Sequence, residues 1–316
     1  MNKKIRVWIV GLILITLLSG CGIEVRSNGI FTSNSSLADI EVNETKNFEY
    51  AGLNKIVVDV SSTDINVITE ERTDILVKLT GKKSENVEHE LNTEKSSENL
   101  YIEVVIQSTG FNSVVSDFKL DIFVPKSYSN DFKAESTSGD ISIKDFAVKN
   151  LNLSLSSGDI ELKNIESSSL NIELTSGDTD INKLTTKKFD YEASSGDLTA
   201  EELTTTEFNY DVTSGDIDID RFIGNIDGEG SSASINIDYQ DFHNNIEIQS
   251  TSGDVTIDLP ENAEFALNAE VSSGDITCNF PITVKGKHEE DSLKGTVISD
   301  KNKITIQASS GDIKIK

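Results

Sequence analysis

The aspartates are the residues of this chain whose type and spacing could do chemistry. The triplet Ser-Gly-Asp occurs eight times, and its first five aspartates, Asp140 to Asp216, follow one another at intervals of 19 residues. A fixed period of this length is typical of a repeat architecture. The Gly-Asp pairs are Gly139 and Asp140, Gly158 and Asp159, Gly177 and Asp178, Gly196 and Asp197, Gly215 and Asp216, Gly253 and Asp254, Gly274 and Asp275, and Gly311 and Asp312.

Two kinds of chemistry are compatible with such a column of carboxylates. In stacked repeats the carboxylates would stand roughly 5 Å apart, where two charges repel by about 0.8 kcal/mol in water. Calcium between them would remove the repulsion, as in the nonapeptide repeats that bind this ion. The favoured alternative is a structural corner, in which glycine supplies a positive φ and each aspartate accepts hydrogen bonds from the amides just after it. We therefore expect no cofactor, and calcium stays open as the alternative.

The residues between the aspartates predict strands. Counted from each aspartate, apolar residues recur at positions +1, +3, +6, +11, +13 and +15 and polar residues lie between them. Steps of two are the strand period, so each repeat reads as two short strands joined by turns. Stacked copies would bury the apolar faces that a single copy cannot. We predict an all-β chain folded as a parallel β-solenoid, in which Ile143, Leu162, Ile181, Ala200 and Ile219 share one inward column.

The repeat weakens toward both ends. Ile56, Val58 and Val60 lead into a degenerate corner at Asp64, where Thr63 replaces glycine. We assign 47–316 to one solenoid domain, with 47–135 as an irregular β cap and 136–316 as regular repeats. Lys314 lies between Ile313 and Ile315 of the last strand and Lys316 follows it, and lysines there would discourage another chain from pairing with an open edge.

The first residues predict a membrane anchor. Lys3, Lys4 and Arg6 precede an apolar run from Val7 to Leu18, which is typical of a secretory signal at 1–20. The following Leu-Ser-Gly-Cys looks like the lipobox of bacterial lipoproteins, in which Cys21 receives fatty acids such as palmitate. An uncleaved transmembrane anchor is the alternative, although the run is short for a span. Residues 21–46 have no sustained alternation, and we expect a flexible tether there.

The charge of the chain restricts its partners. There are 28 Lys+Arg against 54 Asp+Glu, a formal net charge of −26, and removal of 1–20 makes it −29 because three basic residues and no acid are lost. Nucleic acid and anionic lipid surfaces are poor partners for such a chain. We expect membrane contact only through the lipid on Cys21.

The pattern resembles a known family. The run Leu120-Asp121-Ile122-Phe123-Val124-Pro125, followed by repeated Ser-Gly-Asp corners, is similar to the β-strand-repeat putative adhesin family of bacterial envelope proteins. The resemblance covers roughly 47–316. It implies a β-solenoid at the cell envelope, often linked to envelope-stress loci, and it carries no agreed catalytic residues.

No catalytic or metal-ligating set is predicted. His89, His243 and His288 lie in irregular segments, and no spacing brings them together. Cys278 occupies the inward +3 position, as expected of a small core residue. We predict a lipid-anchored, non-catalytic binding module exposed outside the cytoplasm, with an unidentified envelope or protein partner. The alternative is an envelope enzyme acting on polysaccharide, since some β-solenoids are lyases or hydrolases.

Overall fold

The computed structural model describes residues 40–108, 115–284 and 291–316, and these residues form strands and turns. The strands are β1 (Ile40–Glu49), β2 (Lys55–Val60), β3 (Asp64–Glu70), β4 (Asp74–Lys83), β5 (Val87–Lys95), β6 (Asn99–Ser108), β7 (Val115–Pro125), β8 (Asp131–Ser138), β9 (Ile141–Ser157), β10 (Ile160–Ser176), β11 (Thr179–Thr185), β12 (Lys188–Ser195), β13 (Leu198–Ser214), β14 (Ile217–Ser232), β15 (Ile235–Tyr239), β16 (Ile246–Ser252), β17 (Val255–Asp258), β18 (Phe265–Val271), β19 (Ile276–Cys278), β20 (Thr283–Val284), β21 (Ser292–Val297), β22 (Asn302–Ser310) and β23 (Ile313–Ile315). In the described part of the chain, no helix has the length and apolar character to cross a membrane.

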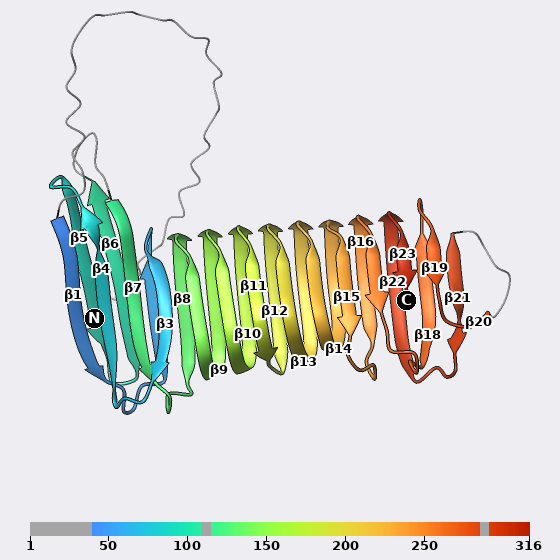
Figure 1. Cartoon of the computed structure of the whole chain (residues 1–316), viewed down its shortest axis with the longest axis horizontal. Coiled ribbons are helices and arrows are strands. Elements are labelled where there is room, and N and C mark those ends of the chain that lie inside the picture. The colour runs from blue at the N-terminus through green and yellow to red at the C-terminus, as the bar shows by residue number, and fades with distance from the viewer. Residues whose placement is uncertain (1–39, 109–114, 285–290) are drawn as a thin grey trace, which may run out of the picture. The chain divides into compact units, whose positions relative to one another are not determined.

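The strands stack into two faces joined at the corners. The pre-corner face, whose strands run into a corner, has the order β5-β6-β2-β8-β9-β10-β12-β13-β14-β16-β22-β18-β21-β20. The post-corner face, whose strands leave a corner, has the order β1-β4-β7-β3-β9-β10-β11-β13-β14-β15-β17-β23-β19. Long strands such as β9 and β10 bend and belong to both faces, and Figure 1 shows the stack from the side.

Parallel, in-register pairing confirms the predicted solenoid. Leu162 lies opposite Ile143 and Ile181, and the column continues through Ala200 to Ile219. All five side chains are buried, because alternation places every second residue inside the coil. The 19-residue period is thus one turn of the solenoid, with pairing between identical positions of successive coils.

The terminal coils do not lie at the ends of the stack. Strands β2 and β3 lie between β6 and β7 on one side and β8 and β9 on the other. Strands β22 and β23 lie between β16 and β17 on one side and β18 and β19 on the other. In Figure 1 the light-blue β3 therefore stands beside green strands, and red β22 stands beside orange ones.

This order corrects two expectations. The last strand, β23, is paired on both sides, so Lys314 does not protect an open edge; its Nζ instead lies 3.1 Å from Asp254 Oδ2 and 3.2 Å from Asp312 Oδ2. The expected tether at 21–46 also ends earlier than predicted. Strand β1 begins at Ile40 and pairs antiparallel with β4, so 40–46 belong to the sheet, and 21–39 lie outside the described residues.

Aromatic side chains form a contact chain through the core. Phe189 and Phe208 stack with ring centroids 5.0 Å apart, Phe208 makes a tilted contact with Phe222, and Phe222 meets Tyr239 edge-to-face. Such pairs stabilise a core beyond the area that they bury. Cys278, the inward +3 residue of the last coil on the post-corner face, is only half-buried, and burial raises the pKa of its thiol.

Candidate functional site

The corner aspartates form a ladder of hydrogen bonds between coils. Oδ1 of Asp140 accepts the backbone N–H of Asp159 at 2.9 Å, and Asp159 accepts that of Asp178 in the same way. The ladder continues through Asp197 and Asp216 to the N–H of Ser234, which fills the corner without an aspartate. It begins earlier than the regular repeats, because the degenerate corner at Asp64 accepts from Asp140 at 3.2 Å.

The prediction that each aspartate binds amides of its own corner was therefore wrong. The coils lie one strand spacing apart, about 4.8 Å, so a short carboxylate reaches the amide of the next corner. A backbone N–H donated to a carboxylate is a charge-assisted bond and favours the ionised form. The pKa of Asp254 is lowered mainly by the Asp312 N–H, and that of Asp312 mainly by the Asp275 N–H, with Lys314 adding to both.

The corner glycines are required for two reasons. Seven of the eight corner glycines have the predicted positive φ, namely Gly158, Gly177, Gly196, Gly215, Gly253, Gly274 and Gly311, and for Gly139 the prediction was wrong. In addition, a Cβ built on Gly177 would lie 2.0 Å from the carbonyl oxygen of Gly158 in the neighbouring coil. A Cβ built on Gly139 would likewise lie 2.6 Å from the carbonyl oxygen of Thr63. The corners are thus packed backbone against backbone.

A second column, made mainly of carboxylates, lies on the outside of the pre-corner face. Apart from Glu103, each member lies five residues before a corner aspartate or before Ser234, and the members are paired in register from β6 to β18. We call it the acidic column: Glu103, Asp59, Glu135, Ser154, Glu173, Glu192, Asp211, Glu229, Gln249, Gln307 and Glu270. The pKa of Asp59 is raised, first by desolvation and then by Glu135 and Glu103 on either side.

Hydroxyl side chains run parallel to the acidic column. Two residues after each member from Ser154 to Glu270, the chain has serine or threonine: Ser156, Thr175, Ser194, Thr213, Ser231, Thr251, Ser309 and Ser272. Together the two columns line adjoining hollows of about 300 and 640 Å³, which share Asp211. Inward-facing residues lie between the columns, among them Leu155, Leu174, Ala193 and Gly230. We call this feature the acidic groove.

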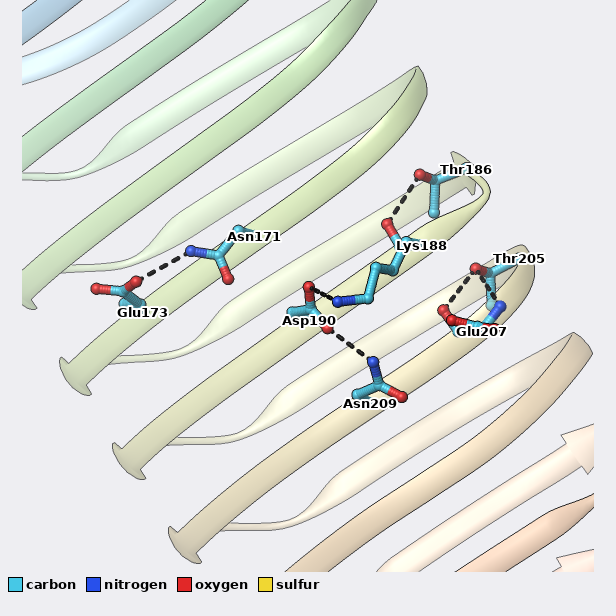
Figure 2. Close-up of polar contacts among 8 residues, drawn as sticks. All are labelled: Asn171, Glu173, Thr186, Lys188, Asp190, Thr205, Glu207 and Asn209. Carbon is cyan, nitrogen blue, oxygen red and sulfur yellow. Dashed lines mark hydrogen bonds and ion pairs between the residues drawn. The ribbon is translucent and has the colours of Figure 1, made fainter.

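Polar residues beside the acidic groove are mostly paired, as Figure 2 shows. Asp190, at position +12, accepts from Lys188 Nζ at 2.8 Å and from Asn209 Nδ2 at 2.8 Å. Glu173, at the end of the groove, accepts from Asn171 Nδ2 at 3.0 Å. Thr186 and Thr205 hold the bends by donating to the carbonyl oxygens of Lys188 and Glu207.

The sequence-predicted site residues thus fall into different places. All eight corner aspartates take part in such bonds, in two runs. The first run, from Asp140 to Asp216, ends at Ser234. In the second, Asp254 accepts from Asp312, and Asp312 accepts from Asp275. Cys21 lies outside the described residues. Within the described residues, no group of three or more His, Cys, Asp or Glu side chains is placed to hold a metal ion. The acidic groove was not predicted, although its residues keep fixed offsets from the corners.

Comparison with known proteins identifies the repeat pattern. The model of a family described as Toastrack DUF4097 matches residues 53–316. None of the curated proteins compared with the chain matches it.

Solved structures that resemble this chain include two from Parabacteroides. A putative adhesin from Parabacteroides merdae is 15% identical, with 86% of this chain and 96% of that chain covered and a TM-score of 0.52. A putative lipid binding protein from Parabacteroides distasonis is also 15% identical, with 86% and 97% covered and a TM-score of 0.46. At this identity the likeness shows the fold alone.

Proposed function

The chain belongs to the Toastrack DUF4097 family, and on that premise we propose that it is a lipid-anchored, non-catalytic binding module of the bacterial cell surface. Cys21 carries the lipid, and the stack of coils displays its outer faces to a partner in the envelope. Envelope stress is the setting that the family resemblance suggests.

The acidic groove is the observation that supports a binding role. Core packing explains the inward columns and backbone bonding explains the corners, but neither requires carboxylates opposite one another on the outside of β10, β12, β13 and β14. Surface-exposed like charges directly opposite one another in neighbouring strands are destabilising. A partner that neutralises them offsets this cost, and an extended face suits an extended partner.

Two experiments test this function. A fatty-acid analogue should label the full chain in cells, and Cys21→Ser should abolish the label and leave the precursor unprocessed. Equal labelling of the two proteins would refute the anchor. Envelope extract passed over the immobilised chain should yield a partner that salt elutes, because the face is charged.

An envelope polysaccharide enzyme is the second candidate. Retaining glycosidases use two carboxyl groups about 5–5.5 Å apart, which is close to the spacing of neighbouring coils. Turnover of cell-wall glycans by the chain, lost in Asp211→Asn, would favour this candidate over the binding module.

A further inference from the structure

Strand β1 covers one end of the core with a polar inner face. Its pairing with β4 turns every second residue of β1 toward the buried side of that strand. The inward residues are Val42, Glu44, Lys46 and Phe48. Of these four, only Val42 is buried, and two carry a charge. The residues opposite them on β4 include Ile75, Val77 and Leu79, which are fully buried. Burial of apolar area therefore holds β1 less firmly than it holds β4.

Three polar contacts fasten β1 to the opposite face of the stack. They are His89 Nε2 to Glu44 Oε1 at 2.8 Å, Lys46 Nζ to the Leu91 carbonyl oxygen at 2.5 Å and Lys95 Nζ to the Glu49 carbonyl oxygen at 2.5 Å. We call these three contacts the clasp, because they join β1, at the end of the post-corner face, to β5, at the end of the pre-corner face. Among the described strands, β1 pairs only with β4. Partly exposed polar contacts contribute less stability than buried apolar side chains.

The segment that the clasp holds has a defined end at Leu53. The Leu53 side chain is 1% exposed, and its carbonyl oxygen accepts from Asn130 Nδ2 at 2.6 Å. Gly52, just before it, has a φ of 82°, and nothing lies closer than 3.9 Å to a Cβ built there. An exposed contact between Tyr50 OH and Ser127 Oγ completes the turn. Leu53 is therefore fixed to the stack, whereas Gly52 has the conformational freedom of a hinge.

We propose that β1 is a releasable strap, which detaches with its turn as one unit while the other strands stay paired. This inference rests on the proposed anchor at Cys21, because the tether from that residue enters the sheet at Ile40. Detachment adds residues 40–52 to the tether, and an extended chain of this length spans roughly 40 Å. A stack bound to an envelope partner can then follow that partner over this distance while its core stays intact.

A permanent cap is the alternative explanation of the polar inner face. Inward-pointing charges on an edge strand discourage another strand from pairing there, and Glu44 and Lys46 would serve that purpose in a β1 that never opens. The two explanations differ in whether β1 exchanges its amide protons independently of the stack, since local opening has a lower free energy than global unfolding.

The test is amide hydrogen exchange of the lipidated full chain in neutral detergent, followed by mass spectrometry. We expect the hydrogen-bonded amides of β1 to share one protection factor, at least about tenfold lower than that of β2. The clasp variant Glu44→Ala with Lys46→Ala should lower this protection about tenfold further and leave β2 unchanged. The matched control, Glu41→Ala with Lys82→Ala, removes one glutamate and one lysine from the outward side of the same strand pair. It should change the protection of β1 by less than about threefold.

A disulfide supplies an independent check on the strap. Thr45 and Lys78 lie opposite each other on β1 and β4, at a separation that a disulfide can span. In Thr45→Cys with Lys78→Cys, oxidation should raise the protection of β1 to that of β2, and reduction should reverse the effect.

Three outcomes overturn the proposal, and the first two use the unaltered chain. Equal protection of β1 and β2 would show a permanent cap. Protection that rises steadily from Ile40 to Glu49 would show fraying of an edge instead of release as a unit. An equal effect of the clasp variant and its control would show that the clasp does not hold the strap. An unlabelled Cys21 in cells would refute the anchor, whereas a β1 that stays closed in a lipidated chain would refute only the strap.

Discussion

The corner column and the acidic column are both lines of carboxylates that repeat once per coil, but their surroundings are opposite. At the corner each carboxylate receives a backbone N–H, and the pKa values of Asp254 and Asp312 are lowered as a result. On the pre-corner face the sheet uses its N–H groups for strand pairing, and the pKa of Asp59 is raised, first by burial and then by the carboxylates of Glu135 and Glu103. Two columns of carboxylates with the same spacing can therefore have opposite effects on the stability of the fold. The difference depends on whether hydrogen-bond donors face the carboxylates.

Substitutions should destabilise the protein more at the corners than in the acidic column. Replacement of a corner glycine should cause the largest loss of stability. Gly177→Ala places a Cβ 2.0 Å from the Gly158 carbonyl at a φ of 124°. We expect a loss on the order of 3 kcal/mol, measured as a lower urea midpoint. Gly230→Ala, in the floor of the acidic groove, is the control and should change stability by less than about 0.5 kcal/mol. Similar losses for the two would contradict the backbone packing described for the corner.

Removal of a corner carboxylate should come next. Asp178→Ala leaves the Asp197 N–H without its acceptor and should cost about 1–2 kcal/mol. Asp178→Asn keeps an oxygen in place and should cost less. Glu192→Ala in the acidic column should be close to neutral in the same unfolding experiment. The distinction between the columns would be lost if Glu192→Ala were as costly as Asp178→Ala.

Acid should weaken the corner contacts of the C-terminal coil. The folded-state pKa values of Asp254 and Asp312 are lowered, so their stabilisation is present above the unfolded value of 3.8 and is lost as pH falls through the folded values. The urea midpoint should therefore drop below about pH 4. In the double variant Asp254→Asn, Asp312→Asn the urea midpoint should fall less as the pH is lowered. If the midpoint fell as steeply as in the native protein, the corner hydrogen bonds would not be the cause of the acid sensitivity.

In the acidic column the effect of pH should have the opposite sign. The raised pKa of Asp59 means that its charge destabilises the folded state above that pKa and that protonation relieves the cost. Asp59→Asn should raise the stability at pH 7 by a few tenths of a kcal/mol. The gain should vanish in acid, where the native carboxyl is neutral as well. If Asp59→Asn were less stable than the native protein at pH 7, the Asp59 carboxylate would have to be stabilised by a hydrogen-bond donor.

The smallest expected effect concerns calcium. If the Oδ1 atoms of the corner column are occupied by backbone N–H groups, EDTA should leave the melting temperature unchanged. A rise of several degrees on adding calcium, weakened by Asp178→Asn, would show that the corners are a cation ladder instead.

Much of the fold was predictable because strand alternation and the 19-residue period are local signals. They identified the inward columns, including Ile143, Leu162 and Ile181, and the degenerate corner at Asp64. The order of coils at the ends was not predictable. The apolar pattern of 302–315 fits any neighbouring coil equally well, so alternation cannot say which coil it joins.

The candidate site was less accessible for physical reasons. An aspartate after glycine can accept a bond within its own corner or from the next coil, and the sequence is the same in both cases. The acidic groove left a signal, since Glu173, Glu192 and Asp211 all occupy position +14. Outward polar residues satisfy any solvent-facing strand, however, so only the pairing of the coils shows that these charges are neighbours.

The inserted position of the terminal coils has a consequence for how the stack folds. Strands β22 and β23 can pair completely only after the chain from β16 to β21 has left a gap of the right width, so this segment closes the C-terminal part of the stack. Strands β2 and β3 must likewise wait for β6 to β9. Such non-local closure raises contact order and slows folding. Deletion of 302–316 should keep a partly built stack in which β18 and β19 have lost the strands that join them to β16 and β17.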